Sequence, residues 1–374
     1  MSVEKLKSQD AYAAELLRIL AFFANESIYY DLLSADEEDP WPGLGNIMQT
    51  KATFERSMAR LRDYSLVETS RRCYRLHPCV HDWTLSSLNQ HVEESDIWRA
   101  MTCVVAAGRI AYEIWETDDG DPQSRLASHA MRLMHPRLYD VLENSELDEE
   151  RCNLLCGLGG VLAHAGMAEE ATPLLGRSLA WSHQHLGEEH HVSLNTSNVV
   201  GLAQQELQNF SQAENLMKQA IHGLRELWAS MTKPPWTQSI TLHCFIRKRF
   251  DEAEDLYLWS LRGCEESYGP LDVNTFWAML ALAEFYATKD EPGEVEKFLH
   301  QILKGFEAAA DSDHPMSRAA ASRLGAIYEQ KGNHHSAAAM FQRVYDSCGR
   351  VHGPEHWSTL EAQENLTQLE AKSR

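Results

Sequence analysis

The chain has 374 residues, of which 44% are hydrophobic and 24% charged, and its formal net charge is −21. These values are typical of a folded chain long enough for two or three domains or for an elongated array. Residues 1–90 carry 10 basic against 13 acidic side chains, so most of the negative charge lies downstream. A duplex-binding protein needs a cationic face, so nucleic acid is not expected as a partner and the acidic balance favours a basic ligand.

Cysteine usage and hydropathy indicate the compartment. The eight cysteines include no CxxC pair, which is typical of reduced thiols in a cytoplasmic protein. The apolar run near the N-terminus is interrupted by Glu15 and Arg18, as in an amphipathic helix and unlike a signal peptide. The longest uncharged stretch, Cys152–Ala168, contains Asn153, His164 and several glycines, so no membrane association is expected.

Residues 1–90 combine three helical patterns with one hairpin pattern. Apolar residues recur at helical spacing in Tyr12–Ala24, Ile28–Leu33 and Thr53–Tyr64. The sequence LVETSRRCYRLHPCV (66–80) then alternates in the manner of a short β-hairpin. Three helices and a hairpin predict a small winged-helix-like domain.

This segment resembles a known class of signalling proteins. NESIYYDLL, FERSMARLRDYSLVETS and YRLHPCVHDW are similar to the end of the nucleotide-binding module in fungal signalling ATPases of the NB-ARC/NACHT (STAND) type that carry tetratricopeptide repeat (TPR) arms. Residues 91–146, with RLASHAMRLMHPRL, resemble the helical connector of those proteins. In that family the winged helix ends in a Met-His-Asp-like motif whose histidine faces the β-phosphate of ADP. Leu76 and His77 match its first two residues, but Pro78 replaces the aspartate.

That replacement leaves two interpretations of His77. It is either a nucleotide-facing residue in a fuller protein with an upstream nucleotide-binding module, or a histidine packed under the wing, and Pro78 favours the second. His81 and Asp82 are expected to be structural or exposed. His77, Cys79 and His81 alternate along a predicted extended strand, and the sequence contains no second cluster of metal-ligating residues. A zinc site, which needs four converging ligands, is therefore not expected.

Sequence patterns for catalysis are absent. The chain contains no GxxxxGK[ST], GxSxG or HExxH, so it is not predicted to be an enzyme, to hold a cofactor or to hydrolyse ATP by itself. The acidic pair Glu149-Glu150 falls at a predicted helix edge, where a solvated face is the simpler interpretation. The doublets His190-His191 and His334-His335 fall at predicted turns and are interpreted as surface residues.

Five segments of the downstream region repeat at spacings of 42, 40, 42 and 42 residues. A small or short residue anchors each segment, a large apolar residue follows four positions later, and a small or short residue lies twelve positions earlier. Small residues let two helices approach and large ones fill the gap, so each segment predicts an antiparallel helix pair that stacks on its neighbours. The anchors are Ala171, Ala213, Ala253, Val295 and Ala337, the large residues are Leu175, Met217, Tyr257, Leu299 and Phe341, and the earlier residues are Gly159, Gly201, Thr241, Ala283 and Gly325.

Gly, Pro and acidic residues recur in register between the pairs, in LGEEH (186–190), YGPLD (268–272), ADSDHP (310–315) and HGPEH (352–356). They stop one helix and suit the start of the next. The pattern resembles TPRs of the kinesin-light-chain-like kind over 147–372. It implies an all-α fold, a right-handed TPR superhelix (α-solenoid) with five helix pairs over 147–352 and a capping helix over 353–374. The third pair, with Pro234-Pro235 and Thr241, departs most from the pattern.

Function is expected on the concave surface of such a superhelix, which is lined by the first helix of each pair. Asn198 matches the asparagine that, in kinesin-light-chain-like proteins, hydrogen-bonds the backbone of a bound peptide. An amide suits an extended peptide because it offers both a donor and an acceptor. The candidate peptide-binding residues are Asn195, Asn198, Leu202, Gln205, Gln238, Leu280, Glu284, Ser322, Arg323 and Glu329.

The leading hypothesis is a non-catalytic protein-interaction module, the TPR sensor or scaffold part of a STAND-type signalling protein, which binds a peptide or protein partner. One rival is a free-standing kinesin-light-chain-like adaptor in which residues 1–90 only protect the open end of the stack. The other rival is an enzyme built in a helical toroid. Nucleotide binding distinguishes the first two, and a pocket with converging perturbed acids would favour the third.

Overall fold

The computed structural model describes residues 10–33, 41, 51–70, 73–113, 122–229, 250–309, 311–354 and 357–372. Helices make up nearly all of the regular structure in these ranges, and their one sheet has two strands. The fold is all-α, as the sequence predicts. The chain divides into two compact units, with the main division between Ala220 and Ile221. None of the described helices is both long and apolar enough to cross a membrane.

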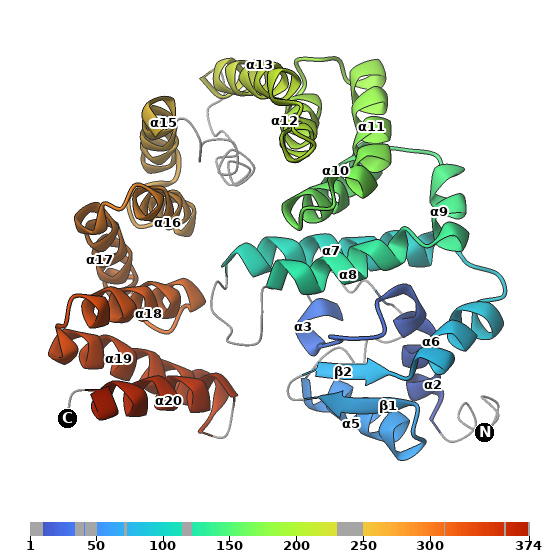
Figure 1. Ribbon diagram of the computed structural model, residues 1–374, viewed down its shortest axis with the longest axis horizontal. Helices are drawn as coiled ribbons and strands as arrows, with labels where there is room; N and C mark the ends of the chain where they lie inside the picture. The colour runs from blue at the N-terminus through green and yellow to red at the C-terminus, as the bar shows by residue number, and fades with distance from the viewer. Residues whose placement is uncertain are drawn as a thin grey trace. The chain divides into compact units, whose positions relative to one another are not determined.

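The first unit begins with short helices and a hairpin (Figure 1). The helices are α2 (Ala11–Ile19), η1 (Leu20–Phe22), α3 (Tyr30–Leu33) and α5 (Lys51–Asp63), and β1 (Val67–Ser70) then pairs antiparallel with β2 (Cys73–Leu76). Asp10 starts α2 because its carboxylate accepts a hydrogen bond from the Ala13 N–H at 2.9 Å. Leu17 of α2 and Phe54 of α5 are fully buried, so the apolar faces that predict these helices form the local core.

The hairpin ends sooner than the sequence predicts. β2 stops before His77, and Pro78 begins α6 (Pro78–Trp83). Proline suits this position because the first N–H of a helix has no partner in any case and the φ of proline is already helical. The expectation that His77, Cys79 and His81 alternate along one strand is therefore wrong, since Cys79 and His81 follow helical spacing.

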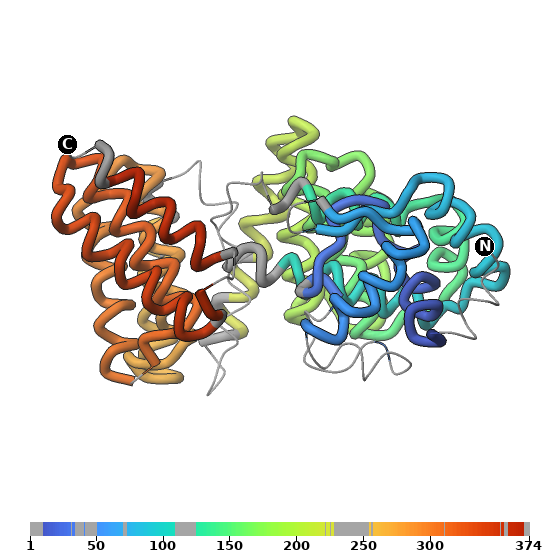
Figure 2. The backbone as a smooth tube through the Cα atoms, turned by 90° about the horizontal axis from the view of Figure 1, so that it is seen from below, coloured from blue at the N-terminus to red at the C-terminus, as the bar shows by residue number. Residues whose placement is uncertain are grey.

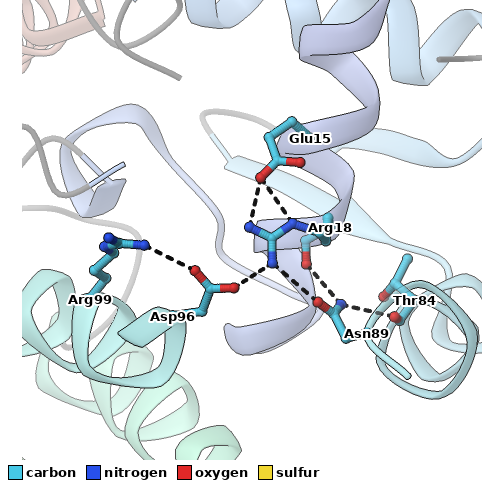
Figure 3. A network of polar contacts seen from close by, with 6 residues as sticks. All are labelled: Glu15, Arg18, Thr84, Asn89, Asp96 and Arg99. Atoms are coloured by element: carbon cyan, nitrogen blue, oxygen red, sulfur yellow. Dashed lines mark hydrogen bonds and ion pairs between the residues drawn. The ribbon is translucent and has the colours of Figure 1, made fainter. Parts of the chain in front are cut away.

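A polar network holds α2 against the one-turn π-helix η3 (Thr84–Leu88) and against α7 (Glu94–Glu113), which follow α6 (Figure 3). The next helices are α8 (Pro122–Leu133) and α9 (Pro136–Glu143). Asp96 of α7 is buried and pairs with Arg18 and, at 3.3 Å, with Arg99. Asn89 is also buried and donates to the backbone oxygen of Arg18 at 3.1 Å. The network therefore joins three segments that are distant in the sequence.

We expect Asp96→Asn to lower the free energy of unfolding of the first unit by about 1–2 kcal/mol. The amide keeps the shape but loses the charge that pairs with Arg18 and Arg99, and the 28% exposure of the Arg18 side chain limits the loss. Urea denaturation with hydrogen exchange of α2 and α7 peptides measures the change. Glu15→Gln, which alters a 35% exposed partner of Arg18, is the control and should change stability by less than about 0.5 kcal/mol. Equal losses in both variants would contradict the prediction.

Arginines also tie successive parts of the first unit together through backbone oxygens. Arg132 of α8 donates to the Ala21 oxygen at 3.0 Å, and Arg137 of α9 donates to the Leu85 oxygen at 2.9 Å. Charged donors make stronger hydrogen bonds than neutral ones. The N-terminal segment and α7–α9 therefore pack as parts of one unit.

Helices come in pairs from α10 onward. The first unit holds α10 (Glu149–His164) with α11 (Ala168–His185), and α12 (His191–Glu206) with the start of α13 (Phe210–Ala229). The second unit holds α15 (Phe250–Tyr268), α16 (Val273–Thr288) with α17 (Pro292–Ala308), α18 (Pro315–Gln330) with α19 (His334–His352), and α20 (Trp357–Lys372). Within the second unit, helices from α15 to α20 contact their neighbours in order (Figure 1, Figure 2). The described helices recur at the spacing of the repeat. The segment predicted as the first helix of the third pair, with Pro234-Pro235 and Thr241, lies outside the described residues.

Each pair turns at the same point of the repeat. Gly166 and Gly332, which follow α10 and α18, have φ values of 77° and 72°, a left-handed conformation that glycine adopts without steric cost. In the second and fourth pairs this position is held by Gln208 and Asp290, with φ values of 63° and 58°. A side chain there costs about 1 kcal/mol. The left-handed turn therefore recurs at the same position of the repeat, whether or not that position is a glycine.

The residue before each of four first helices caps that helix, and for α12, α16 and α18 this residue belongs to a recurring linker. Asp148 and Asp272 cap α10 and α16, and their carboxylates accept backbone N–H groups at 2.8 and 2.9 Å. His190 and His314 cap α12 and α18, and their Nδ1 atoms accept backbone N–H groups at 3.4 and 3.2 Å. A histidine can accept in this way only when its ring is neutral.

Small and large residues meet as the repeat predicts. A Cβ atom built on Gly159, Gly201 or Gly325 would lie 2.6, 2.5 or 2.6 Å from the side chain of Leu175, Met217 or Phe341, respectively. Real Cβ atoms do not approach so closely, so the large side chain of each second helix fills space that glycine leaves on the first. The anchors Ala171, Ala213, Val295 and Ala337 are buried, and the side chain of Ala253 lies outside the described residues.

Candidate functional site

The predicted peptide-binding residues lie on α12, α16 and α18, the first helices of the second, fourth and fifth pairs. The first-helix surface is defined as Asn195, Asn198, Leu202 and Gln205 on α12, Leu280 and Glu284 on α16, and Ser322, Arg323 and Glu329 on α18. The predicted Gln238 lies outside the described residues. The α12 part belongs to the first unit and the α16–α18 part to the second.

Asn198 is the most distinctive residue of the α12 part. Its side chain is 2% exposed, and its Oδ1 atom has no hydrogen-bond partner. A buried acceptor without a donor costs about 1–3 kcal/mol, so such an atom usually has a role. Asn195 and Gln205 are partly exposed on the same helix, while Leu202 is buried. The helix thus holds an unpaired amide oxygen close to partly exposed polar side chains.

An ion pair dominates the α16–α18 part. Arg323 Nη2 lies 2.9 Å from Glu284 Oε1, and the two side chains are 20% and 16% exposed. The pair bridges the first helices of consecutive repeats, with Leu280 buried one turn before Glu284. Because both charged groups remain partly exposed, a charged ligand group can reach them. Ser322 and Glu329 are partly exposed on α18.

His77 lies at the surface. Its side chain is exposed, and its Nδ1 atom caps α6 by accepting the Cys79 N–H at 3.3 Å. The interpretation that His77 packs under the wing is therefore wrong, because the strand ends before it and the cap position faces solvent. Since the cap occupies only Nδ1, the Nε2 atom remains available for another interaction.

Two other histidines are buried instead. His81 Nε2 bonds the Phe23 oxygen at 2.7 Å, whereas His129 accepts the Ala24 N–H at 3.0 Å and donates to the Ser27 oxygen at 3.2 Å. Burial lowers the pKa of each to about 4. They hold the Phe23–Ser27 segment in place. Sequence spacing does not distinguish His129 from a surface histidine, because its backbone partners lie more than a hundred residues away.

Comparison with known proteins explains the helix pairs. One tetratricopeptide repeat model matches residues 150–226, and a second matches residues 318–358. The chain contains tetratricopeptide repeats. The matches cover α10–α13 and most of α18 with α19, and so they include both Asn198 and Arg323. Repeats of this kind form protein-interaction modules.

Two solved structures of TPR proteins align with the chain. Nearly identical TPR-like repeats of a Podosopora anserina kinesin light chain align with 18% identity and a TM-score of 0.43, over 55% of this chain and 99% of that one. A STAND protein with a tetratricopeptide repeat sensor from Pyrococcus horikoshii aligns with 14% identity and a TM-score of 0.43, over 97% of this chain and 54% of that one. No curated protein matches the sequence.

Proposed function

We propose that the tetratricopeptide repeats bind an extended peptide, or an extended segment of a protein, through the α12 part of the first-helix surface, and that the α16–α18 part, which belongs to the other unit, binds such a segment on its own. The observation that carries this proposal is the buried, unpaired Oδ1 atom of Asn198. Binding turns the Asn198 side chain towards the ligand, whose backbone N–H then donates to this oxygen and removes the cost of leaving it unpaired. An extended peptide supplies such donors because its backbone has no internal partners.

The charge balance favours a basic ligand. The chain carries a net charge of −21, and Glu284 and Glu329 lie on the first-helix surface with Arg323. A lysine or arginine of the ligand can compete with Arg323 for the Glu284 carboxylate, since the 2.9 Å pair is partly exposed. An acidic peptide would instead meet repulsion from most of the surrounding charge.

Asn198→Leu is expected to weaken binding of a basic peptide by about tenfold while leaving stability nearly unchanged. Leucine has a similar shape but no acceptor, and the replaced oxygen has no partner within the protein. An array of basic and acidic peptides identifies a binding sequence, and fluorescence polarisation then measures its affinity for each variant.

Two further variants complete this test. Arg323→Ala tests the α16–α18 part separately and should change the affinity of a basic peptide that binds there, whereas Lys297→Ala, which alters a 54% exposed residue of the second helix α17, should not. Unchanged affinity in both Asn198→Leu and Arg323→Ala would exclude the first-helix surface. Preference for acidic peptides would contradict the proposed ligand charge.

The proposal assigns the chain a non-catalytic role in the cytoplasm, as the sensor or scaffold part of a STAND-type signalling protein. TPR modules act as scaffolds, and the cysteines that the structure describes are free, which suits a reducing compartment. The N-terminal segment is proposed to be winged-helix-like. In support, α2, α3 and α5 precede the hairpin, and Ile28 forms a bridge with Tyr74 of β2.

In this signalling role, the exposed His77 faces a nucleotide held by an upstream module. The second candidate is a free-standing adaptor without nucleotide-linked signalling. Isothermal titration of ADP into the protein, together with any upstream segment that its gene encodes, separates the two. Binding that is lost in His77→Ala supports the signalling role, and the absence of ADP binding supports the adaptor.

A further inference from the structure

Two histidines and a glutamate converge where the first two repeats begin. His190 caps α12 and His191 is its first residue, while Glu149 is the first residue of α10. One ligand atom from each of the three side chains lies within 4.8 Å of the other two. His191 Nε2 is 3.8 Å from Glu149 Oε1, and the two imidazole rings are 4.3 Å apart. Helices from consecutive repeats thus contribute to one cluster.

We propose that Glu149, His190 and His191 bind a divalent transition-metal ion of the zinc type. Imidazole nitrogens and a carboxylate oxygen form a ligand set that Zn²⁺ accepts, and a set without thiolates also suits Co²⁺ and Ni²⁺. Tetrahedral coordination at about 2.1 Å places ligand atoms about 3.4 Å apart. The observed 3.8 Å between His191 and Glu149 approaches this spacing, and small rotations of partly exposed side chains close the rest.

The surroundings of the cluster both oppose and favour a cation. The starts of α10 and α12 carry partial positive charge, which disfavours a metal ion. Four acidic residues adjoin the ligands in sequence and offset this charge, namely Asp148, Glu150, Glu188 and Glu189. Glu149 is exposed and the histidines are only partly buried, so water can fill a fourth coordination position.

Metal binding competes with one hydrogen bond. The Nδ1 atom of His190 accepts the Val192 N–H at 3.4 Å, which is longer than a strong hydrogen bond. A neutral imidazole has one acceptor nitrogen, so coordination through His190 gives up this cap. The ion in return joins the starts of α10 and α12. It therefore links the first helices of the first two repeats.

The test is titration of the full chain with ZnCl₂ by calorimetry and with CoCl₂ by absorption. We expect one ion per chain, a Co²⁺ spectrum of low coordination number, and an affinity that falls by at least about tenfold in His191→Ala and Glu149→Gln. His190→Asn is the sharpest variant, because asparagine is a good helix cap but a poor ligand for zinc. It should keep the helical content and lose the ion.

His222→Ala provides the matched control. His222 and Glu226 form an exposed pair at 3.6 Å on α13. Among the described residues, this histidine and carboxylate have no third metal-ligating side chain beside them. This variant should bind Zn²⁺ as the wild type does. Circular dichroism without metal verifies that each variant is folded. If the wild type shows no saturable binding, or if the three cluster variants retain its affinity, the proposal is wrong.

Discussion

Gly305→Ala is expected to lower the free energy of unfolding of the second unit by about 2 kcal/mol. A Cβ atom at Gly305 of α17 would overlap the ring of Phe276 on α16. That ring is 1% exposed, and its centroid lies 4.6 Å from that of Phe306, so it has no free space to enter. The strain of overpacking therefore exceeds the gain of about 1 kcal/mol that alanine brings to a helix interior.

Gly293→Ala in the same helix provides the control. Gly293 is exposed near the start of α17, and no neighbouring atom lies within 4 Å of the position that a Cβ atom would take there. Alanine at this position should leave stability unchanged or raise it by up to about 1 kcal/mol. Urea denaturation with hydrogen exchange of α16 and α17 peptides measures both variants.

The double variant Gly305→Ala/Phe276→Leu tests the cause of the loss. If the clash with Phe276 is responsible, the double variant is destabilised by less than the sum of its two single changes. Additive losses, or equal stability of Gly305→Ala and Gly293→Ala, would show that Phe276 does not limit the space at Gly305.

The repeat could be predicted from the sequence because the contacts that define it join residues close together in the chain. The contact between Gly325 and Phe341 joins residues sixteen apart in adjacent helices, and the same spacing recurs at Gly159 and Gly201. A short connection fixes which faces of two antiparallel helices meet, so spacing alone predicts the contact. The glycine at Gly305 follows no such period. Its contact with Phe276 was therefore not predicted, although it is closer than the others.

The features that the sequence did not reveal depend on contacts between distant segments. His129 is separated from Ala24 by more than a hundred residues, and Glu149 from His191 by about forty. No periodic pattern brings such residues together. From the sequence alone, His129 is therefore interpreted as one more helical residue and His191 as a surface residue. The end of β2 before His77 was missed for a different reason, because alternation continues through Pro78 in the sequence while the proline starts a helix.

Acidification is expected to destabilise the first unit through His81 and His129. Both are buried, and desolvation lowers the pKa of each to about 4, against about 6.5 for an exposed histidine. Between these values the unfolded chain binds protons that the native state excludes. The stabilisation is complete above about pH 6.5 and is lost as the pH falls towards about 4. The fully buried His129 alone accounts for about 3 kcal/mol of this change.

Other groups add to the loss or titrate outside this window. Desolvation also lowers the pKa values of His191, which is partly buried, and of His135, which is exposed, so both act in the same direction in the same unit. In the second unit the hydrogen bond from Arg350 lowers the pKa of Asp313 to about 2. Stability that depends on this carboxylate is present above its unfolded pKa of about 3.8 and is lost at lower pH, so it does not overlap the histidine window.

His129→Asn isolates the largest contribution to this pH dependence. The amide oxygen of asparagine can still accept the Ala24 N–H, but the bond to the Ser27 oxygen is lost, so the variant is less stable near neutral pH. Because the side chain of asparagine does not titrate, urea denaturation at a series of pH values should give a shallower slope than in the wild type, and the two proteins should converge near pH 4. His222→Ala, at a 72% exposed side chain, should retain the wild-type slope. A slope that stays unchanged in His129→Asn would show that His129 is protonated in the native state well above pH 4, and so that its two backbone bonds do not fix a neutral ring.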